Sequence, residues 1–256
     1  AGLEFTPEER EQIAKGLSRT LNQFESIHNS SIPNDLPPAF QFNPHPPGYL
    51  PPSKQSAITF SSPKKSKRPR NLEDLAHWSI IDLAGLIKSR KITARELTEM
   101  YLARLKKYTP ELHCVITLTE ERALRQSDQA DIEIAAGKYL GPLHGIPWGA
   151  KDLLAVKGYP TTWGATPYKD QTFDYDATVV QRLDAAGAIL VAKLSLGALA
   201  QNDIWFGERT RNPWNTERGS SGSSAGPASA TSAGLVAFSI GTETNGSIVS
   251  PATTCG

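Results

Sequence analysis

The chain has 256 residues, 39% of them hydrophobic, and a formal net charge of +1 at pH 7. This composition is typical of a globular protein of one or two domains, and the near-neutral charge argues against nucleic acid or an anionic membrane as the main partner. No stretch approaches the roughly 18 consecutive apolar residues that a membrane span needs.

The N-terminal part of the sequence reads as an extension over residues 1–71, helical at first and then rich in proline. A helix is predicted over residues 5–28, because Thr6 and Glu9 form a capping box ahead of an apolar stripe at helical spacing. More than half of the 19 prolines lie between residues 33 and 69, which indicates extended, irregular chain.

From residue 72 onward, predicted helices alternate with predicted strands. We expect helices over residues 79–88, 93–108, 120–136 and 177–186, and strands over 112–118, 145–157, 188–193 and 235–240. Such alternation predicts an α/β fold with a mixed, largely parallel sheet covered by helices on both faces.

The residues that suggest chemistry are one lysine and two glycine-rich loops that carry serines. The lysine is Lys151 in the apolar segment GIPWGAK, and the loops are GSSAGPASATSAG from Gly222 and GTETNGS ending at Ser247. A serine hydroxyl is a weak nucleophile until a neighbour takes its proton. A lysine can take it only when neutral, and burial lowers its pKa; a shift of about 3 units costs about 4 kcal/mol of stability.

These segments resemble the amidase signature family. The resemblance covers about residues 72–256 and rests on GIPWGAKDLLAVKGYPTTWG, on the NPW at Asn212, and on the two serine-bearing loops. It implies the amidase signature fold for this region, as the N-terminal part of a catalytic domain. Members of the family continue well beyond the nucleophile loop, so we expect residues 72–256 to be an incomplete domain.

The resemblance also implies a role for each polar residue. Lys151 corresponds to the base, Ser223 to a bridging serine that follows a cis peptide bond, and Ser247 to the nucleophile. The family's spacing between its two serines selects Ser223 from a group of four candidates. Those candidates are Ser220, Ser221, Ser223 and Ser224.

An oxyanion hole built from backbone N–H groups belongs to the same pattern, and such donors are fixed before charge develops on the substrate. Its donors correspond to Thr244, Asn245, Gly246 and Ser247. The loop departs from the family at three positions: Asn245 replaces a usual glycine, Glu243 a usual aspartate, and Val249 a usual arginine. These departures leave unchanged the Ser–Ser–Lys triad that the resemblance implies, which consists of Lys151, Ser223 and Ser247.

One competing motif lies inside the first loop. The sequence from Gly222 to Gly226 matches GxSxG, the nucleophile elbow of α/β-hydrolases, with Ser224 as nucleophile. That motif requires a buried strand before the serine and a histidine after it. The preceding NPWNTERGSS is too polar for such a strand, and the last histidine of the chain is His144.

The sequence therefore predicts hydrolysis of the C–N bond of a small-molecule carboxylic amide through an acyl-enzyme, without a metal or an organic cofactor. Two alternatives stay open: a glutamine-hydrolysing A subunit of a tRNA-dependent amidotransferase, and a catalytically silent scaffold. The proline-rich extension and the three departures favour a free-standing amidase.

Cys114 and Cys255 suggest no disulfide framework. A homo-oligomer stays open as a partner, and the location stays open between the cytoplasm and export with a targeting segment removed.

Overall fold

The computed structural model describes residues 4–30, 45, 48–50, 52–54, 57–64 and 67–256. The chain divides into two compact units, residues 1–58 and residues 59–256. Most of the predicted proline-rich stretch lies outside the described residues.

The first unit contains one long helix, α1 (Pro7–His28), where the sequence predicts a helix over residues 5–28. Its N-terminus carries the predicted capping box, in which the Glu9 N–H donates to the Thr6 hydroxyl and the Thr6 N–H donates to the Glu9 carboxylate. The apolar side chains of the helix, Leu17 and Phe24 among them, are exposed.

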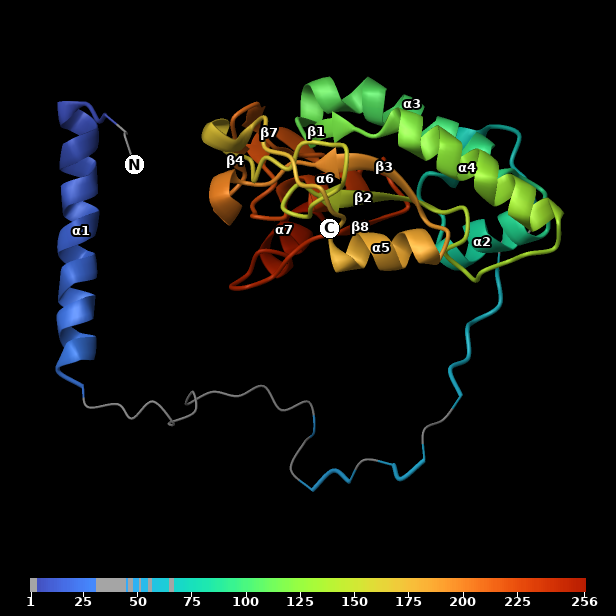
Figure 1. Ribbon diagram of the computed structural model, residues 1–256, viewed down its shortest axis with the longest axis horizontal. Coiled ribbons are helices and arrows are strands. Elements are labelled where there is room, and N and C mark those ends of the chain that lie inside the picture. Colours follow the sequence, from blue (N-terminus) through green and yellow to red (C-terminus); the bar gives the residue numbers. More distant parts are fainter. Residues whose placement is uncertain (1–3, 31–44, 46–47, 51, 55–56, 65–66) are drawn as a thin grey trace. The chain divides into compact units, whose positions relative to one another are not determined.

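The second unit is an α/β fold built around a four-stranded sheet with the order β1-β3-β2-β8 (Figure 1). The strands are β1 (Val115–Leu118), β2 (Pro147–Lys151), β3 (Ile189–Leu194) and β8 (Phe238–Ile240). Strand β2 runs parallel to both of its neighbours, and β1 pairs antiparallel with β3. The prediction of a mixed, largely parallel sheet is therefore confirmed.

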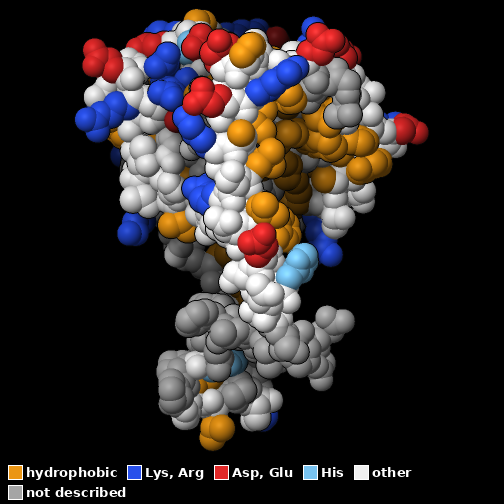
Figure 2. All heavy atoms as spheres, turned by 90° about the vertical axis from the view of Figure 1, so that its left-hand side faces the viewer, with side chains coloured by type: hydrophobic (Ala, Val, Ile, Leu, Met, Phe, Trp, Pro, Cys, Tyr) orange, Lys and Arg blue, Asp and Glu red, His pale blue; other side chains and the backbone are white. Residues whose placement is uncertain are grey.

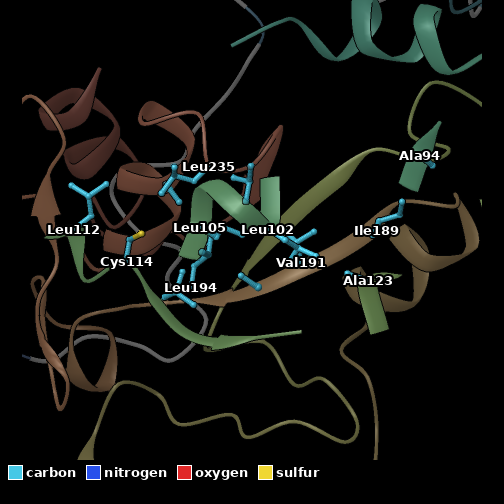
Figure 3. Close-up of a cluster of buried hydrophobic side chains, with 14 of the residues drawn as sticks. Ala94, Leu102, Leu105, Leu112, Cys114, Ala123, Ile189, Val191, Leu194 and Leu235 are labelled. Carbon is cyan, nitrogen blue, oxygen red and sulfur yellow. The ribbon is translucent and has the colours of Figure 1, made fainter. Parts of the chain in front are cut away.

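Helices cover both faces of this sheet. The helices of this unit are α2 (Ile80–Lys88), α3 (Ala94–Leu112), α4 (Glu120–Ala135), α5 (Thr178–Ala185), α6 (Ala225–Ser232) and α7 (Val249–Cys255), the last of which packs against α6. On one face, Val191 of β3 packs with Leu105 of α3 and Ala123 of α4 (Figure 3). On the other face, Leu190 of β3 packs with Val180 of α5. Alternate residues of a strand point to opposite faces, so β3 is buried on both sides.

The four helices predicted in this region, over 79–88, 93–108, 120–136 and 177–186, are confirmed as α2, α3, α4 and α5. Helix α3 continues past the predicted end to Leu112 and includes Pro110 in its last turn. The predicted strand over 112–118 begins only at Val115, since the αL conformation of His113 ends the helix first.

Helix α6 and two further parts of the second unit were not predicted as regular structure. Helix α7 follows the second serine loop directly, and four short strands form two hairpins between β3 and α6. These strands are β4 (Ile204–Trp205), β5 (Glu208–Arg209), β6 (Arg211–Asn212) and β7 (Asn215–Gly219). Strands β4, β5 and β6 have two residues each, too few to show a periodicity, and the five residues of β7 contain no apolar alternation.

The described surface carries charges of both signs. Figure 2 shows acidic and basic side chains intermixed on the face that it draws. Within the described ranges, no helix is both long enough and apolar enough to cross a membrane. The same residues contain no cluster of three or more His, Cys, Asp or Glu side chains that could hold a metal ion.

Candidate active site

The site lies where the parallel strands β2 and β8 end. Lys151 is the last residue of β2, and the second serine loop follows β8 directly. The carboxyl ends of neighbouring parallel strands meet at one edge of a sheet, where α/β proteins bind their ligands. The topology thus brings together two segments that are far apart in the sequence.

Lys151 is fully buried and is surrounded by hydroxyl groups. Its Nζ lies 2.8 Å from Ser223 Oγ, 2.9 Å from Thr242 Oγ1 and 3.1 Å from Ser224 Oγ. None of these partners carries a charge. Burial lowers the pKa of Lys151 to about 8, and the carboxylate of Glu243 opposes this shift. A substantial fraction of the amine is therefore neutral near pH 8.

The neutral amine can both donate and accept. It has two N–H groups and one lone pair, so with three hydroxyl neighbours one hydroxyl must donate to the nitrogen. The Ser224 hydroxyl hydrogen is already engaged, because this group donates to the carbonyl oxygen of Thr242 at 3.2 Å. The hydroxyl that gives its hydrogen to Lys151 is accordingly that of Ser223 or Thr242.

Ser223 sits in a tight loop at the start of α6. The Gly222–Ser223 peptide bond is cis. A side chain at Gly222 could not fit, because a Cβ atom there would lie 1.8 Å from the carbonyl oxygen of Asn202. Ser223 is 1% exposed and still lines a cavity of about 370 Å³.

Ser247 lines that same cavity from the other loop. Its carbonyl oxygen accepts the N–H of Ser224 at 2.9 Å, which ties the two loops together. Among the described residues, no hydrogen bond joins the Ser247 hydroxyl to Ser223 or Lys151. Ser247 and Ser223 therefore share a cavity, while the direct contact with the lysine belongs to Ser223.

The four backbone groups assigned to the oxyanion hole differ in their partners. The N–H groups of Gly246 and Ser247 donate to the carboxylate of Glu243. For the N–H groups of Thr244 and Asn245, no partner is found among the described residues, and both residues line the cavity.

Two residues of this cluster were not foreseen in these positions. Thr242 contacts the lysine directly, although its place five residues before Ser247 in the same glycine-rich motif was a usable signal. Ser224 appeared in the sequence as one of the four candidates for the bridging serine and as the centre of a competing motif. In the structure it joins Lys151 to Thr242, and it lines a different cavity, of about 570 Å³. The strand before it, β7, is mostly exposed, which does not suit a nucleophile elbow.

A second buried lysine supports the segment that follows Lys151. Lys193 Nζ lies 2.6 Å from the Asp152 carboxylate, and both side chains are fully buried. Lys193 also donates to the carbonyl oxygen of Pro160, and Asp152 accepts the N–H of Thr162. This pair anchors the chain after Lys151 to the end of β3.

Comparison with known proteins identifies the family. The model of the family described as Amidase matches residues 96–256. The chain is 39% identical over 183 residues to the A subunit of glutamyl-tRNA(Gln) amidotransferase from Cyanothece sp., covering 70% of this chain and 38% of that protein. The corresponding protein from Acinetobacter baumannii is 39% identical over 188 residues, covering 72% of this chain and 38% of the relative.

Among solved structures, native peptide amidase from Stenotrophomonas maltophilia is similar at 34% identity, with a TM-score of 0.68. The match covers 72% of this chain and 40% of that structure. The chain thus belongs to the amidase family, and the expected amidase signature fold is confirmed. It spans about two fifths of the length of these relatives.

Proposed function

We propose that this chain carries the catalytic groups of an amide hydrolase that works through an acyl-enzyme. Ser247 is the nucleophile, Ser223 relays its proton, and Lys151 is the base. The observation that carries the proposal is the buried, uncharged environment of Lys151, whose shortest contact is the 2.8 Å hydrogen bond to Ser223. Ser223 in turn shares its cavity with Ser247.

The proposed reaction moves one proton along this relay and back. When the Ser247 oxygen attacks the amide carbon, its proton passes to Ser223, and the proton of Ser223 passes to Lys151. The carbonyl π bond becomes a negatively charged oxygen, which backbone N–H groups stabilise. As the C–N bond breaks, the relay returns the proton to the leaving amine. Water then repeats the sequence on the ester and releases the acid.

Labelling by a fluorophosphonate probe tests the proposal without a known substrate, because such probes trap an activated serine as a stable phosphonate ester. The probe should lose its fluoride and leave the phosphonate on Ser247 of the intact protein. Ser247→Ala should abolish labelling. Absence of labelling in the wild-type protein would instead favour the catalytically silent scaffold.

A pair of matched variants tests the order of the relay. Ser223→Ala should lose most labelling, since it removes the hydroxyl between nucleophile and base. Ser224→Ala should be milder, because the hydrogen of that hydroxyl is held by Thr242. If Ser224→Ala silenced labelling while Ser223→Ala remained active, the assignment of the relay would be wrong.

A second candidate shares this chemistry: the glutamine-hydrolysing A subunit of a tRNA-dependent amidotransferase. The 39% identity to the A subunit of glutamyl-tRNA(Gln) amidotransferase favours it. Ammonia release from a panel of amides, measured with and without co-purifying proteins, discriminates the two. A free-standing amidase hydrolyses its amide alone, whereas the amidotransferase component needs its partner proteins and delivers ammonia to charged tRNA.

A further inference from the structure

The loop that carries Ser247 is held by one acidic side chain. The carboxylate of Glu243 accepts four consecutive backbone N–H groups. Their donors are Gly246, Ser247 at 2.9 Å, Ile248 at 2.6 Å and Val249 at 3.1 Å. One carboxylate oxygen accepts the N–H groups of Gly246 and Ser247, and the other accepts those of Ile248 and Val249. The loop is thereby wrapped around a single charged group.

The physical reason lies in the start of α7. The first N–H groups of a helix have no partner inside the helix, and a negatively charged oxygen is their strongest acceptor. Here the groups at Ile248 and Val249 belong to that first turn. These hydrogen bonds, with that of Ile248 as the largest contribution, hold the pKa of Glu243 below its usual range. Glu243 is therefore ionised at neutral pH.

We propose that Glu243 is a positioning residue of the amidase reaction, which fixes the Ser247 loop and divides its backbone donors into two sets. Gly246 and Ser247 point their N–H groups at Glu243. Thr244 and Asn245 line the cavity and keep theirs for the substrate oxygen. This inference rests on the proposed function, since it assumes that Ser247 is the nucleophile.

The charge of Glu243 also reaches the base. It raises the pKa of Lys151 and so opposes the effect of burial. Among the described residues, charged groups near this end of the sheet also include Asp152 and Lys193, which are paired with each other at 2.6 Å, and Asp203, whose carboxylate accepts the Ser221 N–H. A negative charge at position 243 thus raises the pH at which the relay becomes active, against the larger effect of burial, in addition to holding the loop.

The test uses fluorophosphonate labelling of Ser247 in the intact protein, measured as a rate across pH. Glu243→Gln keeps the size of the side chain but replaces one acceptor oxygen with an NH₂ group, which faces two N–H donors. Glu243→Asp keeps the charge and both oxygens on a shorter arm. Glu217→Gln is the matched control, because Glu217 is exposed and its carboxylate makes no hydrogen bond to the described residues. Thermal unfolding of each variant checks that it is folded.

The proposal expects Glu243→Gln to lower the plateau rate by about 10²-fold, the usual cost of a nucleophile misplaced by about 1 Å. The midpoint of its pH profile should move to lower pH, because Lys151 loses the nearby negative charge. Glu243→Asp should keep the wild-type midpoint and recover part of the rate, and Glu217→Gln should match the wild type.

Two results would overturn this role while leaving the proposed function intact. Faster labelling of Glu243→Gln would mean that the carboxylate blocks donors that the reaction needs. A lower plateau with an unmoved midpoint would mean that Glu243 merely supports the fold. Absence of labelling in the wild-type protein would reject the proposed function itself, so the two failures are distinguishable.

Discussion

Two lysines lie fully buried near the ends of adjacent strands, and only one of them contacts a carboxylate. Lys151, at the end of β2, is surrounded by the hydroxyls of Ser223, Ser224 and Thr242. Lys193, near the end of β3, faces the carboxylate of Asp152 at 2.6 Å. The strands run parallel and place the two lysines one residue apart in register.

Burial lowers the pKa of both amines, because it disfavours the charged form. At Lys193 the carboxylate of Asp152 acts in the opposite direction and favours the ammonium. Among the described residues, Lys151 has no such counter-ion in contact, and its hydroxyl neighbours can either accept or donate. Burial without a paired charge favours the neutral amine that the proposed base needs, whereas burial beside a carboxylate favours an ion pair. Five predictions test or delimit this contrast.

The largest effect is expected at the hydroxyl-lined lysine. Lys151→Ala should lower the rate of fluorophosphonate labelling of Ser247 by about 10²–10⁴-fold, the usual contribution of a general base. The control is Lys157→Ala, since Lys157 is an exposed lysine paired with Asp174 at the surface. Labelling of Lys151→Ala at the wild-type rate would show that another group takes the proton.

The second effect is on stability, at the ion-paired lysine. Lys193→Met leaves the Asp152 carboxylate buried without its partner, which should lower the free energy of unfolding by about 3–5 kcal/mol. The double variant Asp152→Asn with Lys193→Met should lose less, because no charge remains buried. Chemical denaturation measures both. A loss no greater than that of Lys157→Met would contradict the structural role of the pair.

The sequence indicated the environment of Lys151 better than that of Lys193. The apolar neighbours of Lys151, together with the two serine loops, suggested a buried and therefore neutral amine. Lys193 read only as the end of a predicted strand, because its partner Asp152 follows a different strand. Pairing between distant segments depends on strand register, which no local pattern contains.

A similar limit applies to the nucleophile loop. Glu243 was visible as a departure from the family pattern, but its contacts with four successive N–H groups depend on how the chain bends into α7. Helix α7 itself was not predicted, since its seven residues include Pro251 and two threonines. The layers of the fold were predictable from long periodic segments, whereas the short elements around the site were not.

The third prediction concerns the pH dependence of the reaction. Only the neutral form of Lys151 can accept a proton, so labelling of Ser247 should rise with pH through a midpoint near the lysine pKa of about 8. An unburied lysine would place this midpoint near its ordinary value of about 10.4. A profile of initial labelling rate against pH measures it. A midpoint close to the unburied value would mean that a negative charge offsets the effect of burial on the pKa of Lys151.

The smallest effect is expected at His144, a buried group outside the lysine cluster. Its Nδ1 accepts the Leu140 N–H at 3.2 Å, and its Nε2 lies 3.4 Å from Glu133. It lines a separate cavity of about 380 Å³ with Glu133 and Gly187. His144→Gln should therefore leave the pH midpoint of Ser247 labelling unchanged. A midpoint that moved with His144 would indicate a histidine base.

The same variant should still have a measurable consequence for stability. Burial lowers the pKa of His144 below its ordinary value, so the unfolded chain takes up a proton at a higher pH than the folded one. The free energy of unfolding then falls as the pH drops below about 6.5, the ordinary histidine value. His144→Gln should lose this component of acid destabilisation, which denaturation at successive pH values would detect. Identical acid profiles for variant and wild type would show that the imidazole is protonated as readily when folded as when unfolded.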